Sequence, residues 1–228
     1  MRHTQGMHVD HPISSSPPVH LPIRAVLWDF GGVILSSPFD AFAQYETQHS
    51  LPAGLIRGIN SANPDTNAWA RFERSDVSFT EFCSLFEAEA LELGHVVDAR
   101  RIMALLHGEI RPQMVEALRK LKAAGYLIAC LTNNVQTGDE RDRSDVDAVM
   151  ELFDHVTQSR NAGVRKPEKR FYELACAAIS IEPTEAVFLD DLGINLKPAA
   201  ALGMRTIKVT DPDVALGELE VILGMSLR

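Results

Sequence analysis

Short apolar runs recur along the chain, and the first of them lies near its start. This run, Ala25–Trp28, leads directly to Asp29 and then to the glycine pair Gly31 and Gly32. An unbroken apolar run predicts a buried strand, and the glycines predict a sharp turn after it. Ligands of an open parallel sheet bind outside the carboxyl ends of its strands. We therefore expect Asp29 to face a binding crevice.

The same pattern returns in the second half of the chain, where apolar runs alternate with segments of helical spacing. Strands are expected at residues 126–131, 155–158, 186–189 and 205–209, and helices at 112–125, 167–178, 196–202 and from 211 onward. Such alternation predicts an α/β fold with a doubly wound parallel sheet. Pro167 suits the first turn of its helix, which would point Lys166 back over the sheet.

Residues 39–107 differ, because they show helical spacing and no convincing strand. Within them, Ser78 and Glu81 have the spacing of a capping box at the start of a helix. We expect this segment to be a helical cap inserted into a core of residues 21–38 and 108–228. Four side chains are candidates for its inner face, although such a stripe is more often plain core: Trp69, Arg71, Phe72 and Arg74.

Composition narrows the remaining possibilities. The 228 residues are 46% hydrophobic with a formal net charge of −9, which favours a globular protein and speaks against nucleic-acid or membrane partners. Residues 1–20 show no periodicity and predict a flexible tail without a leader or anchor, and the charged segment 136–147 predicts a mobile loop. Three scattered cysteines, Cys83, Cys130 and Cys176, suit the core of a reduced, cytoplasmic protein.

Polar residues at the ends of the predicted strands indicate the chemistry. They should meet at one edge of the sheet, with a lysine approaching from a helix start: Asp29, Thr132, Asn133, Asp190, Asp191 and Lys166. Clustered carboxylates repel one another unless a cation neutralises them, and an all-oxygen set favours Mg²⁺. A lysine, a hydroxyl and an amide suit the charge of a transferring phosphoryl group. The pattern therefore predicts hydrolysis of a small-molecule phosphate ester.

Four motifs resemble those of the haloacid dehalogenase superfamily, in the same order along the chain: D-F-G-G-V, L-T-N, R-K-P-E and F-L-D-D-L-G-I-N-L-K-P-A. The resemblance covers nearly everything after the tail. It is stronger still to the amino-terminal phosphatase domain of soluble epoxide hydrolase and the amino-terminal domain of acyl-CoA dehydrogenase family member ten. The implied fold is a parallel α/β core with a small helical cap.

The resemblance also implies a role for each residue of the set. Asp29 would be the nucleophile, Thr132 and Asn133 would hold phosphoryl oxygens, and Lys166 would pair with nucleophile and phosphate. Asp191, assisted by Asp190, would hold Mg²⁺ together with the Asp29 side chain and the Gly31 carbonyl. Asn195 would orient this metal site.

One position departs from the superfamily pattern. Phosphatases of this kind usually carry an acid two residues after the nucleophile, where this chain has Gly31. Loss of a general acid typically costs about 10²- to 10⁴-fold in rate. Two alternatives follow, a 2-haloacid dehalogenase and a weakly active or non-catalytic phosphate-binding module. The pair Asp190 and Asp191 argues against the dehalogenase, and intact Lys166 argues against the inactive module. Oligomeric state and substrate stay open.

Overall fold

The computed structural model describes residues 22–106, 108–134 and 144–228 of the chain. The predicted tail, residues 1–20, and positions 136–143 of the predicted loop lie outside these ranges. Positions 144–147 of that loop are instead the first turn of helix α7, Ser144–Met150. That part of the loop prediction was wrong.

The strands form one sheet in which every neighbouring pair is parallel, in the order β3-β2-β1-β4-β5. In chain order the strands are β1 (Ala25–Trp28), β2 (Leu127–Thr132), β3 (His155–Gln158), β4 (Ala186–Asp190) and β5 (Arg205–Lys208). The chain proceeds from β1 outward to one side and then returns to the other side through β4. This reversal beside β1 is the topological switch point of a doubly wound sheet, so the predicted fold class is confirmed.

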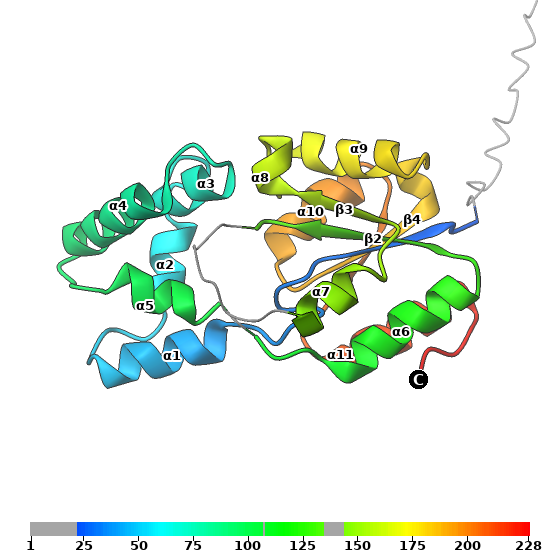
Figure 1. Ribbon diagram of the computed structural model, residues 1–228, viewed down its shortest axis with the longest axis horizontal. Coiled ribbons are helices and arrows are strands. Elements are labelled where there is room, and N and C mark those ends of the chain that lie inside the picture. Colours follow the sequence, from blue (N-terminus) through cyan, green and yellow to red (C-terminus); the bar gives the residue numbers. More distant parts are fainter. Residues whose placement is uncertain (1–21, 107, 135–143) are drawn as a thin grey trace, which may run out of the picture.

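Helices cover both faces of the sheet (Figure 1). Alternate β1 side chains explain the two layers, since Val26 and Trp28 join one core cluster while Ala25 and Leu27 join another. On the first face lie α6 (Pro112–Ala123), α7 and α11 (Pro212–Leu223). On the second face lie α8 (Ser159–Ala162), α9 (Lys169–Ala178) and α10 (Gly193–Ala201), with a 3₁₀ turn at Pro183–Glu185. We call this part the sheet unit.

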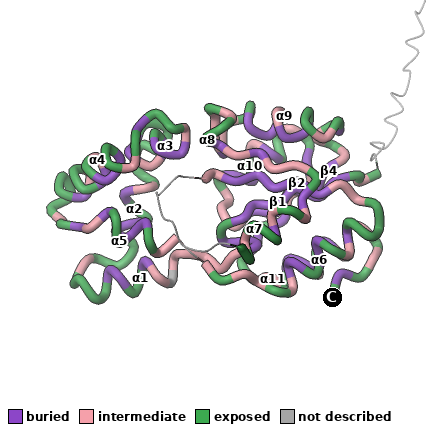
Figure 2. Tube along the Cα trace, viewed as in Figure 1, coloured by how far each residue is buried: buried purple, intermediate pink, exposed green. Residues whose placement is uncertain are grey.

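Five helices between β1 and α6 form a second group, which we call the helical unit (Figure 1). They are α1 (Phe39–Gln48), α2 (Leu55–Ser61), α3 (Ala68–Glu73), α4 (Phe79–Glu92) and α5 (Ala99–Ala104). The group has its own apolar core, in which Phe82 and Phe86 are fully buried. Figure 2 shows this buried interior apart from the buried strands of the sheet. The predicted capping box at the start of α4 is confirmed, because Ser78 and Glu81 bond reciprocally.

Two linkers join the units, and they run antiparallel to each other. Leu35 pairs with Ile110, the Ser36 N–H donates to the Glu109 carbonyl at 2.8 Å, and the Arg111 N–H donates to the Ile34 carbonyl at 2.9 Å. Gly108 lies in this ribbon, where an added Cβ would come within 2.4 Å of the Ser36 carbonyl oxygen. The two linkers are therefore bonded to each other where the chain leaves and re-enters the sheet unit.

Other predictions meet mixed outcomes. Helix α9 begins at Lys169 with Glu168 as its N-cap, so Pro167 precedes the helix and the prediction of Pro167 in its first turn was wrong. The three cysteines are buried and unpaired, as predicted. Among the described helices, none has the length and apolarity needed to span a membrane.

Candidate active site

The carboxyl ends of three adjacent strands bring predicted site residues to one edge of the sheet. Asp29 follows β1, and Thr132 and Asp190 are the last residues of β2 and β4. The Asp29 N–H donates to the Leu189 carbonyl at 2.8 Å, which seats the carboxylate beside β4. Asp29, Thr132 and Asp190 are 8%, 8% and 0% exposed, so their polar groups lie largely out of bulk water. Parallel pairing alone explains why segments distant in sequence meet here.

Lys166 enters this group from the loop between α8 and α9. Its Nζ lies 2.8 Å from Asp29 Oδ1 and 2.7 Å from Asp190 Oδ2, and the residue is 1% exposed. Burial by itself lowers a lysine pKa, but the Asp190 and Asp29 carboxylates raise the pKa of Lys166 above its usual range. The lysine is therefore a fixed positive charge between two carboxylates.

Asp190 has little capacity left for another partner. Its Oδ1 accepts from the Leu192 N–H at 2.8 Å and from Asn195 Nδ2 at 3.0 Å, while its Oδ2 accepts from Lys166. The Tyr172 hydroxyl in turn donates to the Asn195 carbonyl at 2.7 Å. Asp190 is thus held by Asn195, Lys166 and the Leu192 N–H, which leaves Asp29 and Asp191 better placed to face a cation.

A cation fits the acidic cluster. One oxygen from each of Asp29, Asp190 and Asp191 lies within 4.8 Å of the others, an all-oxygen set of the kind Mg²⁺ prefers. Burial, together with repulsion from Asp190, raises the pKa of Asp191 to about 6. Burial also raises the pKa of Asp29, an effect that Lys166 opposes and the other carboxylates reinforce. The cost of ionising these groups is what a bound divalent ion would remove.

The side-chain amide of Asn133 is hydrogen-bonded to protein groups on both its oxygen and its nitrogen. Its Oδ1 accepts from the Lys166 N–H at 2.8 Å, and its Nδ2 donates to the Lys166 carbonyl at 2.9 Å and to Glu73 Oε2 at 3.2 Å. With both amide hydrogens used, this side chain clamps the backbone of the lysine.

The two glycines after Asp29 differ in their surroundings. Gly31 is exposed, lies outside the left-handed region, and has no heavy atom within 4 Å of an added Cβ. Gly32 has φ +78°, and a Cβ there would lie 2.2 Å from the Asp191 carboxylate. Arg111 donates to the Gly32 carbonyl at 2.8 Å, which ties this turn to the linker ribbon. A side chain at position 32 would therefore clash with Asp191, whereas position 31 has space for one.

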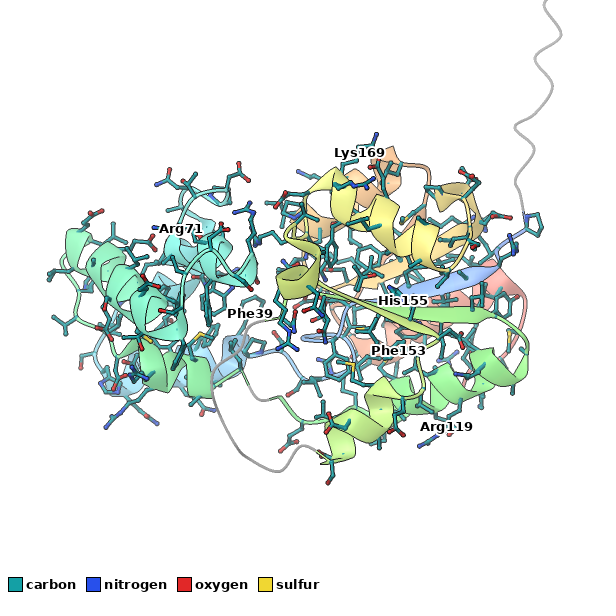
Figure 3. All side chains as sticks on the ribbon, turned by 45° about the horizontal axis from the view of Figure 1, so that its top comes forward. Phe39, Arg71, Arg119, Phe153, His155 and Lys169 are labelled. Atoms are coloured by element: carbon teal, nitrogen blue, oxygen red, sulfur yellow. The ribbon has the colours of Figure 1, made fainter. Side chains whose placement is uncertain are left out.

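Three charged residues at the junction of the units were missing from the predicted site, namely Glu73, Arg165 and Glu168. Arg74, in contrast, was a candidate for the inner face of the helical segment. Glu73 bonds to Arg165, and Arg74 Nε lies 2.8 Å from Glu168 Oε1. In Figure 3, side chains of both units meet in the space between them. Arg165 and Glu168 could have been found as the flanks of the R-K-P-E motif, but Glu73 carries no local signal beyond its neighbour Phe72.

The candidates for the inner face of the helical unit divide as follows. Phe72 is core, since it stacks on Phe82 with ring centroids 4.6 Å apart. Trp69 also contacts Phe82, and its Nε1 donates to Glu73 at 3.0 Å. Arg71, labelled in Figure 3, is exposed on the helical unit. Arg74 alone of the four reaches a sheet-unit residue through a hydrogen bond.

Comparison with known proteins gives a match along most of the chain. A family model for haloacid dehalogenase-like hydrolases matches residues 23–203. Mouse "Acyl-CoA dehydrogenase family member 10" is 34% identical over 100% of this chain, and pig "Bifunctional epoxide hydrolase 2" is 31% identical over 91%. The aligned parts make up only 21% and 40% of those two relatives.

A solved structure shares the fold. It is an enzyme of the same family from Bacteroides thetaiotaomicron, in complex with magnesium and inorganic phosphate. The two structures align with a TM-score of 0.56 at 20% identity, over 82% of this chain and 93% of the other. At this identity the likeness establishes the arrangement of the elements.

Proposed function

The chain belongs to the haloacid dehalogenase-like hydrolase family, and we propose that within it this protein is a Mg²⁺-dependent phosphatase. Its substrate would be a small-molecule phosphomonoester, cleaved through an aspartyl-phosphate intermediate on Asp29. The observation that carries the proposal is the contact of one buried lysine with two carboxylates beside a third, at the carboxyl edge of the sheet. The related enzyme that holds magnesium and phosphate supports the same chemistry.

The proposed metal ligands are the Asp29 and Asp191 carboxylates and the Gly31 carbonyl. A bound Mg²⁺ would neutralise the negative charge that phosphate and carboxylates bring together. Asp190 would assist these ligands through its negative charge, because its oxygens are held by Lys166, Asn195 and the Leu192 N–H. This assignment gives each carboxylate of the cluster a separate task.

Asp29 would act as the nucleophile in two balanced steps. A carboxylate oxygen forms a bond to phosphorus while the ester P–O bond breaks, and the leaving oxygen departs with the electron pair and takes a proton from water. Water then attacks the aspartyl-phosphate, which releases inorganic phosphate and restores Asp29. The Phe30 N–H, 2.7 Å from Asp29 Oδ1, and Lys166 orient the carboxylate for the attack.

Thr132 and Lys166 would stabilise the phosphoryl oxygens during this transfer. The Thr132 hydroxyl lies at the end of β2, next to the end of β1. Lys166 supplies a positive charge that needs no reorganisation, since the carboxylates already hold it in place. Asn133 would contribute by clamping the Lys166 backbone, because its side-chain amide has no hydrogen left to donate. The helical unit would close the site as a cap.

The test is a hydrolysis screen of phosphomonoesters with Mg²⁺, run beside a chelator arm and a 2-haloacid substrate. We expect phosphate release that requires Mg²⁺ and is abolished in Asp29→Asn, which should keep the wild-type circular dichroism spectrum. Halide release in chelator would favour a dehalogenase. Phosphate binding without turnover in the wild type would favour the non-catalytic module.

A further inference from the structure

Two ion pairs of opposite polarity connect the helical unit to the loop that carries Lys166. Glu73 and Arg74, adjacent at the end of α3, pair with Arg165 and Glu168 respectively. These two partners flank Lys166 in sequence. An exposed ion pair is worth little, but Arg165 and Glu73 side chains are only 13% and 8% exposed. The Glu73 pair is therefore the one placed to influence the site.

Glu73 is bonded from three directions. Trp69 Nε1 donates to its Oε1 at 3.0 Å, while Arg165 Nε and Asn133 Nδ2 both donate to its Oε2. Burial raises the pKa of Glu73, and Arg165 opposes that rise. A carboxylate buried at the boundary of two units with donors from both is costly to hold unless all of its bonds persist.

The contact with Asn133 reaches the lysine directly. The Asn133 amide grips Lys166 through its N–H and its carbonyl, at 2.8 and 2.9 Å. Glu73 takes the second Nδ2 hydrogen at 3.2 Å, so it reinforces the orientation of the amide that the Lys166 backbone also favours. Through Arg165 it also holds the residue immediately before Lys166. Glu73 thus secures the lysine loop at two points.

From this geometry we propose that Glu73 is a positioning residue supplied by the helical unit. By orienting Asn133 and Arg165 it sets the placement of Lys166, so the site is complete only when the helical unit is seated on the sheet unit. The inference rests on the proposed phosphatase function for its kinetic consequence, and on the hydrogen bonds alone for its structural one. Arg74 and Glu168 contribute to seating without touching the Asn133 amide.

The kinetic test compares Glu73→Gln with Arg74→Gln, using p-nitrophenyl phosphate and Mg²⁺. A hydrogen bond to a charged group is worth a rate factor of roughly 10- to 100-fold, so Glu73→Gln should lower kcat/KM by that factor. Arg74→Gln removes the neighbouring ion pair and the hydrogen bonds of Arg74 to the Asp65 and Ala70 carbonyls. It leaves every bond to Asn133 in place, so a change of less than about threefold is expected. Equal losses in both variants would mean that Glu73 merely holds the units together, which would overturn the proposal.

A spectroscopic test does not depend on turnover. The side-chain amide resonances of Asn133, assigned by their loss in Asn133→Ala, should shift in Glu73→Gln and stay in place in Arg74→Gln. Unmoved resonances in Glu73→Gln would refute the positioning role. If the wild type cleaves no phosphomonoester, the proposed function fails and the resonances alone decide this inference.

A third variant, Glu73→Asp, tests the proposal if Glu73→Gln does not fold. Glu73→Asp keeps the charge for Arg165 but shortens the reach to Asn133, so it should fold if Glu73→Gln does not. We expect it to shift the same Asn133 resonances and to lower kcat/KM. A fully active Glu73→Asp with unshifted resonances would count against the proposal.

Discussion

At the scale of single residues, the hydrogen bonds and ion pairs of each polar side chain determine which groups of the site can still bind a ligand. Asp190 and Asn133 lie at strand ends as expected, yet their side chains are engaged with Lys166. Asp29 and Asp191 carry the electrostatic cost of the cluster, since both have raised pKa values. Gly31 stands where a general acid would be useful, and its conformation admits a side chain.

Gly31→Asp should therefore be tolerated and should restore a proton donor. In the wild type, aryl phosphates should be cleaved much faster than alkyl phosphates, because a phenolate leaves without protonation and an alkoxide does not. The substitution should narrow this gap, by up to about 10²-fold for the poorest leaving groups. The measurement is kcat/KM against leaving-group pKa in both proteins. A flat dependence in the wild type would show that another group already donates the proton.

Asp191 makes a prediction about pH and stability. An acid whose pKa is raised from 3.8 to about 6 by folding binds its proton more tightly in the folded state. In chelator, the folded state should therefore lose stability as pH rises through this window, and Mg²⁺ should restore it by binding the ionised form.

Asp191→Asn removes both effects. The rise in pKa from 3.8 to about 6 corresponds to about 3 kcal/mol at about pH 8, so without metal the Tm of the variant should exceed that of the wild type by roughly 6–12 °C in a domain of this size. Added Mg²⁺ should then raise the wild-type Tm and leave the variant unchanged. A wild-type Tm in chelator that stays level from about pH 4 to pH 8 would contradict this account.

At the scale of elements, local signals located the strands and the starts of α4, α6 and α11, whereas the helix expected at 196–202 is α10, which begins earlier, at Gly193. The run at residues 25–28 is β1, and the predicted strand at 155–158 is β3. Asp211 caps α11, where its side chain accepts from two backbone N–H groups. The start of α9 was misplaced because Pro167 suits a turn before a helix as well as the first turn within one.

Ser78→Ala tests the most local of these signals. The Ser78 hydroxyl accepts from the Glu81 N–H at 3.3 Å, and Glu81 Oε2 accepts from the Ser78 N–H at 2.8 Å. Loss of the N-cap should lower the free energy of unfolding by about 1 kcal/mol in urea titrations. Ser84→Ala is the matched control, since that serine lies on the exposed side of the same helix. Equal effects of the two substitutions would show that the cap adds nothing.

At the scale of the whole molecule, the site depends on how two separately packed units meet. The linker ribbon and the Glu73 and Arg74 ion pairs are contacts between them. Arg111 connects the ribbon to the Gly32 turn that faces Asp191. A change in the ribbon should therefore alter catalysis at a distance from Asp29.

Gly108→Ala should make such a change. Its new methyl group would meet the Ser36 carbonyl oxygen at 2.4 Å, and backbone must move to relieve the clash. We expect a loss of about 1–3 kcal/mol in unfolding free energy, as for other overpacked sites, together with a lower kcat/KM. Unfolding titrations and initial rates with p-nitrophenyl phosphate measure the two effects.

Gly58→Ala is the control, since Gly58 lies in α2 with nothing within 4 Å of the added atom. It should gain up to about 1 kcal/mol from better helix propensity, at unchanged rate. A Gly108→Ala protein as stable and active as the wild type would show that the linker backbone accommodates the added methyl group without cost.

The sequence by itself determined the order of the elements and the composition of the sheet edge. Hydrophobic periodicity reflects which faces of each element are buried, and it is readable within a few residues. Parallel strands share the edge at which they end, so the sequence alone predicted that Asp29, Thr132 and Asp190 lie close together. The helical character of the segment between β1 and α6 followed from the same local patterns.

Only the tertiary structure decided how these side chains are used. Glu73 lies 60 positions from Asn133 and 92 from Arg165, and no local pattern encodes contacts across two separately packed units. The room at Gly31 depends on a backbone angle and on neighbours distant in the chain. The bonds that commit Asp190 to Lys166 depend on loops closing to within 3 Å. Such contacts arise when whole elements pack against one another, so they cannot be read from a local stretch of sequence.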